Sequence, residues 1–133
     1  MSDENIELVR RMYEDFAARG LEMAVDYLDP EIEWLPPKDA PHPEVHRGVE
    51  GARAELAEWM GEFHDYAWEP REFVAAPGGR VVVIGRQRGR GKASGVEVKA
   101  EETHLWTLRG GKAVRLEMFA TAKEALEAVQ PRD

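Results

Sequence analysis

Three side chains of this sequence carry a group able to donate or accept a proton and lie where a ligand could reach them. Tyr13 lies on the apolar stripe of a predicted helix, where its phenol could donate to a carbonyl or enolate oxygen or simply pack in the core. Glu101 lies in a long predicted strand, where apolar surroundings would raise the pKa of its carboxyl group. His46 precedes a predicted helix, and histidine is the usual general base near neutral pH. We therefore treat Tyr13, Glu101 and His46 as candidates for acid/base catalysis.

The direction in which these strand residues face decides their role. Side chains alternate between the two faces of a strand, so Glu101 shares a face with Thr103 and Leu105. If that face is inward, His104 points outward, toward a possible dimer interface. Glu33 competes with Glu101 as the base, and both glutamates could instead lie on a solvated face or pair with an arginine across the strands.

Residues 96–119 form the segment around which the rest of the chain is predicted to fold. They predict two antiparallel strands, at 97–108 and 113–119, joined by a tight turn. The turn is Arg109-Gly110-Gly111-Lys112, and paired glycines supply the positive φ that a short hairpin turn needs. This hairpin must position Glu101 and Thr103.

The remaining segments show the periodicities of helices and of shorter strands. On the third helix we expect Glu55, Glu58 and Glu62 on the outer face, opposite the apolar stripe. The predicted elements are a helix at 6–17 ended by Gly20, a short helix at 21–28, a strand at 31–35, a proline-rich loop at 38–47, a helix from 49–51 to 63, strands at 66–75 and 80–89, and a final helix capped by Thr121 and Glu124.

Helices followed by strands predict an α+β fold. We expect a cone-shaped roll, in which a curved mixed or antiparallel sheet carries the three helices of the N-terminal half on its concave face, with a short C-terminal helix. Such a roll encloses a cavity suited to a small molecule. The predicted lining is apolar and partly aromatic, which favours a flat cyclic ligand, and consists of Phe16, Trp34, Trp59, Phe63, Thr103, Leu105, Leu116 and Met118.

Composition narrows the classes of function. The 133 residues fit a single domain at 1–133, and the 26 acidic against 18 basic residues give a net charge of -8, which disfavours nucleic acid and anionic membranes. The absence of cysteine excludes thiolate chemistry and fits a cytoplasmic location. We expect no cofactor and no metal site, because no spacing brings together the four histidines, His42, His46, His64 and His104.

Four phrases of the sequence resemble one known group of proteins. They are IELVRRMYEDFAARG at 6–20, LDPEIEW at 28–34, HRGVEG at 46–51 and WTLRGGKAV at 106–114. In this order they resemble the SnoaL-like branch of the nuclear transport factor 2-like superfamily, which has the ketosteroid isomerase-like fold. The resemblance implies that fold, but the superfamily includes isomerases, polyketide cyclases, epoxide hydrolases and non-catalytic binding domains.

The catalytic residues of these relatives are only partly retained. The resemblance places the oxyanion-binding tyrosine of the ketosteroid isomerases on Tyr13. Their general base falls on Trp34 or Leu35, and their second oxyanion donor falls on Thr103. Both carboxylates of the limonene epoxide hydrolases lack a counterpart.

Two functions remain open from the sequence. The first is a protein that binds a small apolar cyclic molecule and acts as a cofactor-independent isomerase, cyclase or hydrolase-like enzyme. The second is a non-catalytic ligand-binding or assembly dimer that has lost the catalytic carboxylates of the family. In both cases we expect a homodimer formed through the outer face of the sheet.

Overall fold

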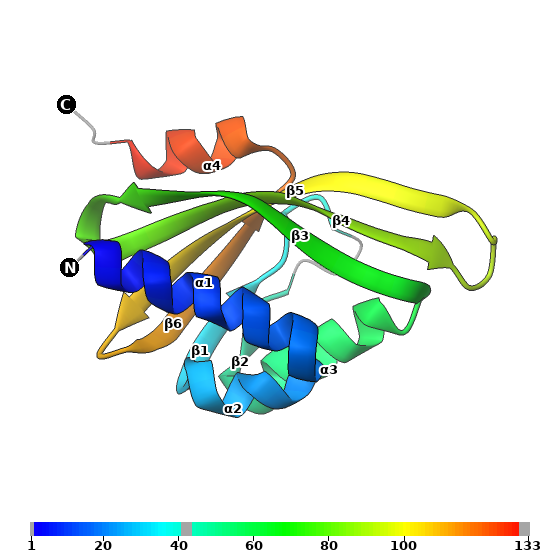
Figure 1. Cartoon of the computed structure of the whole chain (residues 1–133), viewed down its shortest axis with the longest axis horizontal. Coiled ribbons are helices and arrows are strands. Elements are labelled where there is room, and N and C mark those ends of the chain that lie inside the picture. Colours follow the sequence, from blue (N-terminus) through cyan, green and yellow to red (C-terminus); the bar gives the residue numbers. More distant parts are fainter. Residues whose placement is uncertain (1, 41–43, 131–133) are drawn as a thin grey trace.

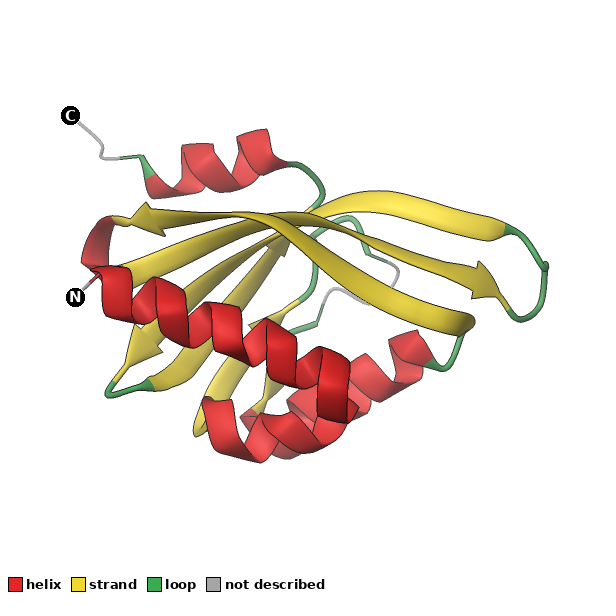
Figure 2. Cartoon of the chain, viewed as in Figure 1, coloured by secondary structure: helices red, strands yellow, loops and turns green. Residues whose placement is uncertain are grey.

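The computed structural model of the chain describes residues 2–40 and 44–130, so His42 lies outside the described residues. Helices dominate the first half and long strands the second, and the predicted α+β fold is confirmed (Figures 1 and 2). The elements are α1 (Ser2–Arg19), η1 (Gly20–Met23), α2 (Ala24–Tyr27), β1 (Leu28–Leu35), β2 (His46–Arg47), α3 (Gly48–Met60), β3 (Phe63–Ala76), η2 (Pro77–Gly79), β4 (Arg80–Gly91), β5 (Glu97–Arg109), β6 (Lys112–Phe119) and α4 (Ala122–Val129).

The strands form one curved mixed sheet in the order β2-β1-β6-β5-β4-β3. Strands β1 and β6 run parallel, and every other neighbouring pair is antiparallel. Helices α1, α2 and α3 lie on one side of this sheet, and α4 lies on the other (Figure 1). One detail differs from the prediction, because His46 and Arg47 leave the expected loop and pair with Trp34 and Glu33 of β1.

The hairpin of β5 and β6 turns as predicted, with positive φ at Gly110 and Gly111. The pairing then shifts by one residue. Leu108 lies opposite Ala113, whereas Thr107 lies opposite Arg115, so Val114 is an extra residue in β6. Such a bulge changes which residues of the two strands share a face.

Two hydrophobic cores lie on opposite faces of the sheet. The larger one joins the N-terminal helices to the concave face, with Val9, Ile32 and Leu116 almost fully buried. The smaller one lies under α4, whose Ala125 and Val129 pack with the outer-face residues Ala76, Val82 and Leu105.

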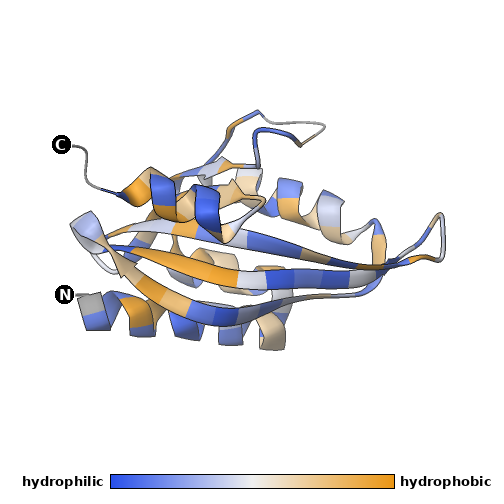
Figure 3. Ribbon diagram, turned by 90° about the horizontal axis from the view of Figure 1, so that it is seen from above, coloured by the Kyte–Doolittle hydropathy of each residue, from blue (hydrophilic) through white to orange (hydrophobic). Residues whose placement is uncertain are grey.

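Figure 3 shows strands that are hydrophobic in the half near α4 and hydrophilic toward the opposite end. Helix α4 packs on part of the outer face of the sheet, the face through which the sequence predicts dimerisation.

Within residues 2–40 and 44–130, no helix combines the length and the apolar character needed to cross a bilayer.

Candidate functional site

A cavity of about 1080 Å³ lies between the N-terminal helices and the concave face of the sheet. Most of its wall is apolar, and tryptophan side chains from β1, α3, β3 and β5 contribute to it. The structure places six of the residues predicted to line a ligand cavity in this wall, namely Phe16, Trp34, Trp59, Phe63, Leu116 and Met118.

The predicted facing of β5 is wrong. Thr103 and Leu105 are buried on the outer face, where Leu105 packs in the core under α4. Glu101 is exposed on that face, and its carboxylate accepts a hydrogen bond of 3.2 Å from the backbone N–H of Ala122. The cause is the extra residue Val114, since an unbroken hairpin would have put Leu105 on the same face as the inward-facing residues of β6.

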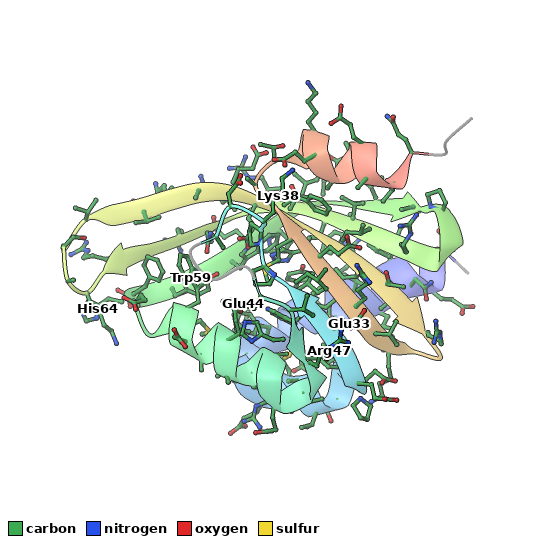
Figure 4. All side chains as sticks on the ribbon, turned by 180° about the vertical axis from the view of Figure 1, so that it is seen from behind. Glu33, Lys38, Glu44, Arg47, Trp59 and His64 are labelled. Carbon is green, nitrogen blue, oxygen red and sulfur yellow. The ribbon has the colours of Figure 1, made fainter. Side chains whose placement is uncertain are left out.

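Tyr13 and His46 both line the cavity, whereas Glu33 does not. The Glu33 carboxylate accepts hydrogen bonds from Arg47 at 2.7 Å and from Arg115 at 3.1 Å. Figure 4 shows Glu33 and Arg47 side by side on β1 and β2. Glu33 therefore serves as a salt-bridge partner at the sheet edge, which is one of the two alternatives that the sequence left open.

A chain of three hydrogen-bonded side chains forms part of the cavity wall. The Tyr13 hydroxyl lies 2.6 Å from His104 Nδ1, and His104 Nε2 lies 2.8 Å from Glu102 Oε1. Trp106 Nε1 donates to the Tyr13 hydroxyl at 2.8 Å, and Trp68 Nε1 donates to Glu102 Oε1 at 3.0 Å. Burial raises the pKa of Tyr13 well above its ordinary value, so Tyr13 stays a neutral phenol.

These contacts allow one consistent placement of hydrogens when His104 is neutral. An ionised Glu102 can only accept, so His104 carries its proton on Nε2 and donates to Glu102. His104 Nδ1 is then an acceptor, and the Tyr13 hydroxyl donates to it. In this state the Tyr13 hydrogen points to His104 rather than into the cavity.

Aromatic stacking holds the imidazole ring in place. The Trp68 ring stacks on His104 with centroids 4.3 Å apart, and Trp106 meets His104 edge-on at 6.3 Å. Trp68 itself lies over Gly85 of β4, where even a methyl group would come within 2.6 Å of the indole ring. The absence of a side chain at Gly85 therefore makes room for Trp68 and, through it, fixes His104 and Glu102.

A second carboxyl group, Glu55 of α3, also lines the cavity. Its Oε2 accepts a hydrogen bond of 3.0 Å from Trp34 Nε1. Burial raises the pKa of Glu55, and the Trp34 N–H opposes this effect only in part. The expectation that Glu55 lies outside is wrong, because α3 packs across the cavity and its long glutamate side chain reaches the wall. Glu58 and Glu62, predicted on the same outer face, also belong to the lining, although both stay exposed to solvent.

Sequence reasoning missed Glu102, His104 and Glu55 as residues of this wall. A signal for the first two exists, since Glu102, His104 and Trp106 follow one another at the two-residue period of a strand face. Among the described residues, no group of three or more histidine or carboxylate side chains is arranged to hold a metal ion.

Comparisons with known proteins agree with this architecture. The model of a family described as SnoaL-like domain matches residues 9–116. The structure of TerC co-crystallised with polyporic acid is 27% identical, with a TM-score of 0.74 over 94% of this chain and 96% of that one. No curated protein matches the chain.

Two further structures share the fold at lower identity. An NTF2-like protein of unknown function from Burkholderia pseudomallei is 24% identical, with a TM-score of 0.75 over 96% of this chain and 98% of that one. A Jannaschia protein assigned as a SnoaL-like polyketide cyclase is 18% identical, with a TM-score of 0.78 over 99% of this chain and 95% of that one.

Proposed function

The chain belongs to the SnoaL-like domain family, and from this premise we propose that it binds a cyclic, largely apolar molecule in its cavity and moves a proton on that molecule by acid/base catalysis. The observation that carries the proposal is the chain of hydrogen bonds from Glu102 through His104 to Tyr13 in the cavity wall. A side-chain relay of this kind, set among stacked aromatic rings, is suited to hydrogen-bond donation in a water-poor site.

Tyr13 is the proposed hydrogen-bond donor to the ligand. When His104 gains a second proton, both of its ring nitrogens become donors, and Nδ1–H donates to the Tyr13 oxygen. The Tyr13 oxygen then accepts from His104 and Trp106, and its own hydrogen is free to point into the cavity. Glu102, 2.8 Å from Nε2, accepts the hydrogen bond from that nitrogen in both protonation states of the ring.

Glu55 is the proposed proton acceptor. A carboxylate is normally a weak base at neutral pH, and burial makes Glu55 a stronger one by raising its pKa. With an enolisable ring ketone, Glu55 would take the proton from the carbon beside the carbonyl group while Tyr13 donates a hydrogen bond to the enolate oxygen. Return of the proton from Glu55 to the same or another carbon completes an exchange or an isomerisation, and no other reactant is needed.

The comparisons support an organic ligand without naming it. TerC was crystallised with polyporic acid, and the Jannaschia protein is assigned as a polyketide cyclase. A cyclase forms a ring, which agrees with a cavity lined by Trp34, Trp68 and Trp106. Flat rings can stack on such indole faces.

The test is proton exchange in heavy water. Tetralone, decalone and indanone, each with and without an amino substituent, are incubated with the protein, and loss of the C–H signal beside the carbonyl group is followed by NMR. We expect exchange with at least one ketone, and a fall of about 100-fold or more in Glu55→Gln, Tyr13→Phe and His104→Gln.

Two matched variants serve as controls. Tyr27→Phe and His64→Gln change the same residue types outside the cavity lining and should keep the wild-type exchange rate. Exchange that survives in Glu55→Gln, Tyr13→Phe and His104→Gln would contradict the mechanism. Binding of the ketones without any exchange would favour the non-catalytic binding protein instead.

A further inference from the structure

Three aromatic rings form a cluster in the part of the cavity wall where α3 ends and β3 begins. The rings of Trp59 and Phe63 have centroids 5.1 Å apart, and those of Phe63 and Tyr66 are 5.7 Å apart. Gln87 Oε1 accepts hydrogen bonds from Trp59 Nε1 at 2.8 Å and from the Tyr66 hydroxyl at 3.1 Å. The rings are therefore held in fixed orientations, and Figure 4 shows Trp59 at this end of α3.

Carboxylates belong to the lining of this cavity, and Glu58 and Glu62 among them are exposed to solvent. Neither Glu58 nor Glu62, on either side of Trp59 in the sequence, forms an ion pair with a lysine or arginine of the described residues. The same holds for the other acidic residues of the wall within 2–40 and 44–130. The acidic members of the lining among the described residues are Asp39, Glu44, Glu55, Glu58, Glu62 and Glu102.

Basic groups in the wall are few. Arg53 is the only lysine or arginine among the described lining residues, and its guanidinium donates to Glu50 at 3.3 Å. Arg53 Nε is buried and has no hydrogen-bond partner within the described part of the chain. The other basic groups are His46 and His104, and His104 is already paired with Glu102.

We infer that the natural ligand of the cavity is a cation, an apolar ring body that carries a protonated amine or a quaternary ammonium group. The inference rests on the proposed function, because that function makes the cavity the ligand site. The carboxylates of the lining then decide which ligand charge is preferred. A cation over the faces of Trp59, Phe63 and Tyr66 is attracted by the ring quadrupoles. The surrounding carboxylates add to this attraction because a cleft lined by one sign of charge focuses the field.

The ammonium group would lie near Glu58 and Glu62, and the ring body would extend toward Trp68, Trp34 and the Tyr13 hydroxyl. Among the described lining residues, an anionic ligand of the same shape would meet six carboxylates, four of them exposed to solvent, against Arg53 and two histidines. The charge of the wall therefore selects against acids, although the apolar surfaces would accept them.

Three fluorescent probes of nearly equal shape test the inference. Pyrenemethylamine, pyrenemethanol and pyrenecarboxylate differ in charge and share the ring system, and fluorescence anisotropy gives a Kd for each. We expect the amine to bind roughly tenfold more tightly than the alcohol, and the carboxylate to bind most weakly. Added salt should weaken the binding of the amine and leave the affinity of the alcohol nearly unchanged.

A pair of double variants separates local from overall charge. Glu58→Gln/Glu62→Gln should remove most of the preference for the amine. Glu7→Gln/Glu31→Gln changes the net charge by the same amount at exposed positions outside the cavity lining and should keep the preference.

The outcomes separate this inference from the proposed function. If no probe binds, the cavity is not a ligand site and the proposed function fails with it. If the alcohol or the carboxylate binds as tightly as the amine, the cavity stands and the inference about charge is wrong. A preference for the amine that is equal in both double variants would also overturn it, because the preference would then come from the net charge alone.

Discussion

Replacing Gly85 by alanine should damage the candidate site without changing any residue that lines it. Gly85 lies on β4 directly opposite Glu102 of β5. A β-carbon at this position would overlap the Glu69 carbonyl oxygen and lie 2.6 Å from the Trp68 ring. Relief of the overlap with the Glu69 oxygen requires β3 to move away from β4, and the Trp68 ring must shift as well. Its hydrogen bond to Glu102 and its stack on His104 are then lost together.

The cost follows from these contacts. Overpacking of a well-packed region costs about 1 to 3 kcal/mol. A hydrogen bond to a charged acceptor, here the one from Trp68 to Glu102, adds about 1.5 to 3 kcal/mol. We therefore expect Gly85→Ala to lower the free energy of unfolding by about 3 kcal/mol or more. For a chain of this length that corresponds to a fall in Tm of roughly 10 °C.

Thermal unfolding followed by circular dichroism measures the stability, and the affinity for pyrenemethylamine measures the state of the cavity. Gly51→Ala is the matched control, since its β-carbon would meet its nearest neighbour at an ordinary 3.6 Å inside α3. It should gain about 0.5 to 1 kcal/mol from the better helix propensity of alanine. If Gly85→Ala unfolds at the same temperature as the wild type and binds the probe equally well, the glycine at this position does not hold Trp68 in place.

Three further variants test other parts of the structure. Tyr13→Phe leaves Trp106 Nε1 and His104 Nδ1 without their partner, and urea unfolding should show a loss of about 1 to 3 kcal/mol; no loss would mean that the chain of hydrogen bonds is not formed. Glu55→Gln should gain stability relative to the wild type as the pH rises from about 4 to 8, because burial raises the pKa of Glu55 in the folded state and its ionisation then disfavours folding. A difference that shrinks with rising pH would contradict this sign. Leu105→Ala should cost about 2 to 5 kcal/mol by thermal unfolding and leave the probe affinity unchanged, whereas weaker probe binding in the folded variant would place Leu105 in the cavity after all.

The sequence was sufficient for the fold because the signals that define it are local. Helical periodicity, the paired glycines at 110–111 and the capping box at Thr121 and Glu124 each act over a few residues. The order of helices and strands then leaves few architectures.

Which side chains of β5 face the cavity could not be predicted from the sequence, because this depends on two non-local features of the structure. Thr103, His104, Leu105 and Trp106 are all buried, since α4 covers one face and the N-terminal helices cover the other. Alternation of apolar and polar residues marks a face only where the other face meets water. The second fact is the bulge at Val114, which no residue type announces.

The placement of Glu55 in the cavity wall could not be predicted without knowing how α3 packs. Helical periodicity identifies the stripe that meets the sheet, but it does not say how far the helix extends over an open cavity. A glutamate beside that stripe can therefore reach the cavity wall and bond to Trp34. The composition of a helix alone would assign the same glutamate to solvent.

The extra residue at Val114 also bears on how this chain can be compared with other members of its family. Leu116 and Met118 share a face with Trp106 and His104 only because β6 is one residue longer than a regular hairpin would make it. In a lineage without that residue, the same β6 phrase would lie beside the odd-numbered positions of β5, with Thr103 and Leu105 among them. The gain or loss of this one residue would thus change which side chains of β5 and β6 face the cavity together. An alignment that forces the hairpin through without a gap would equate residues that face opposite ways.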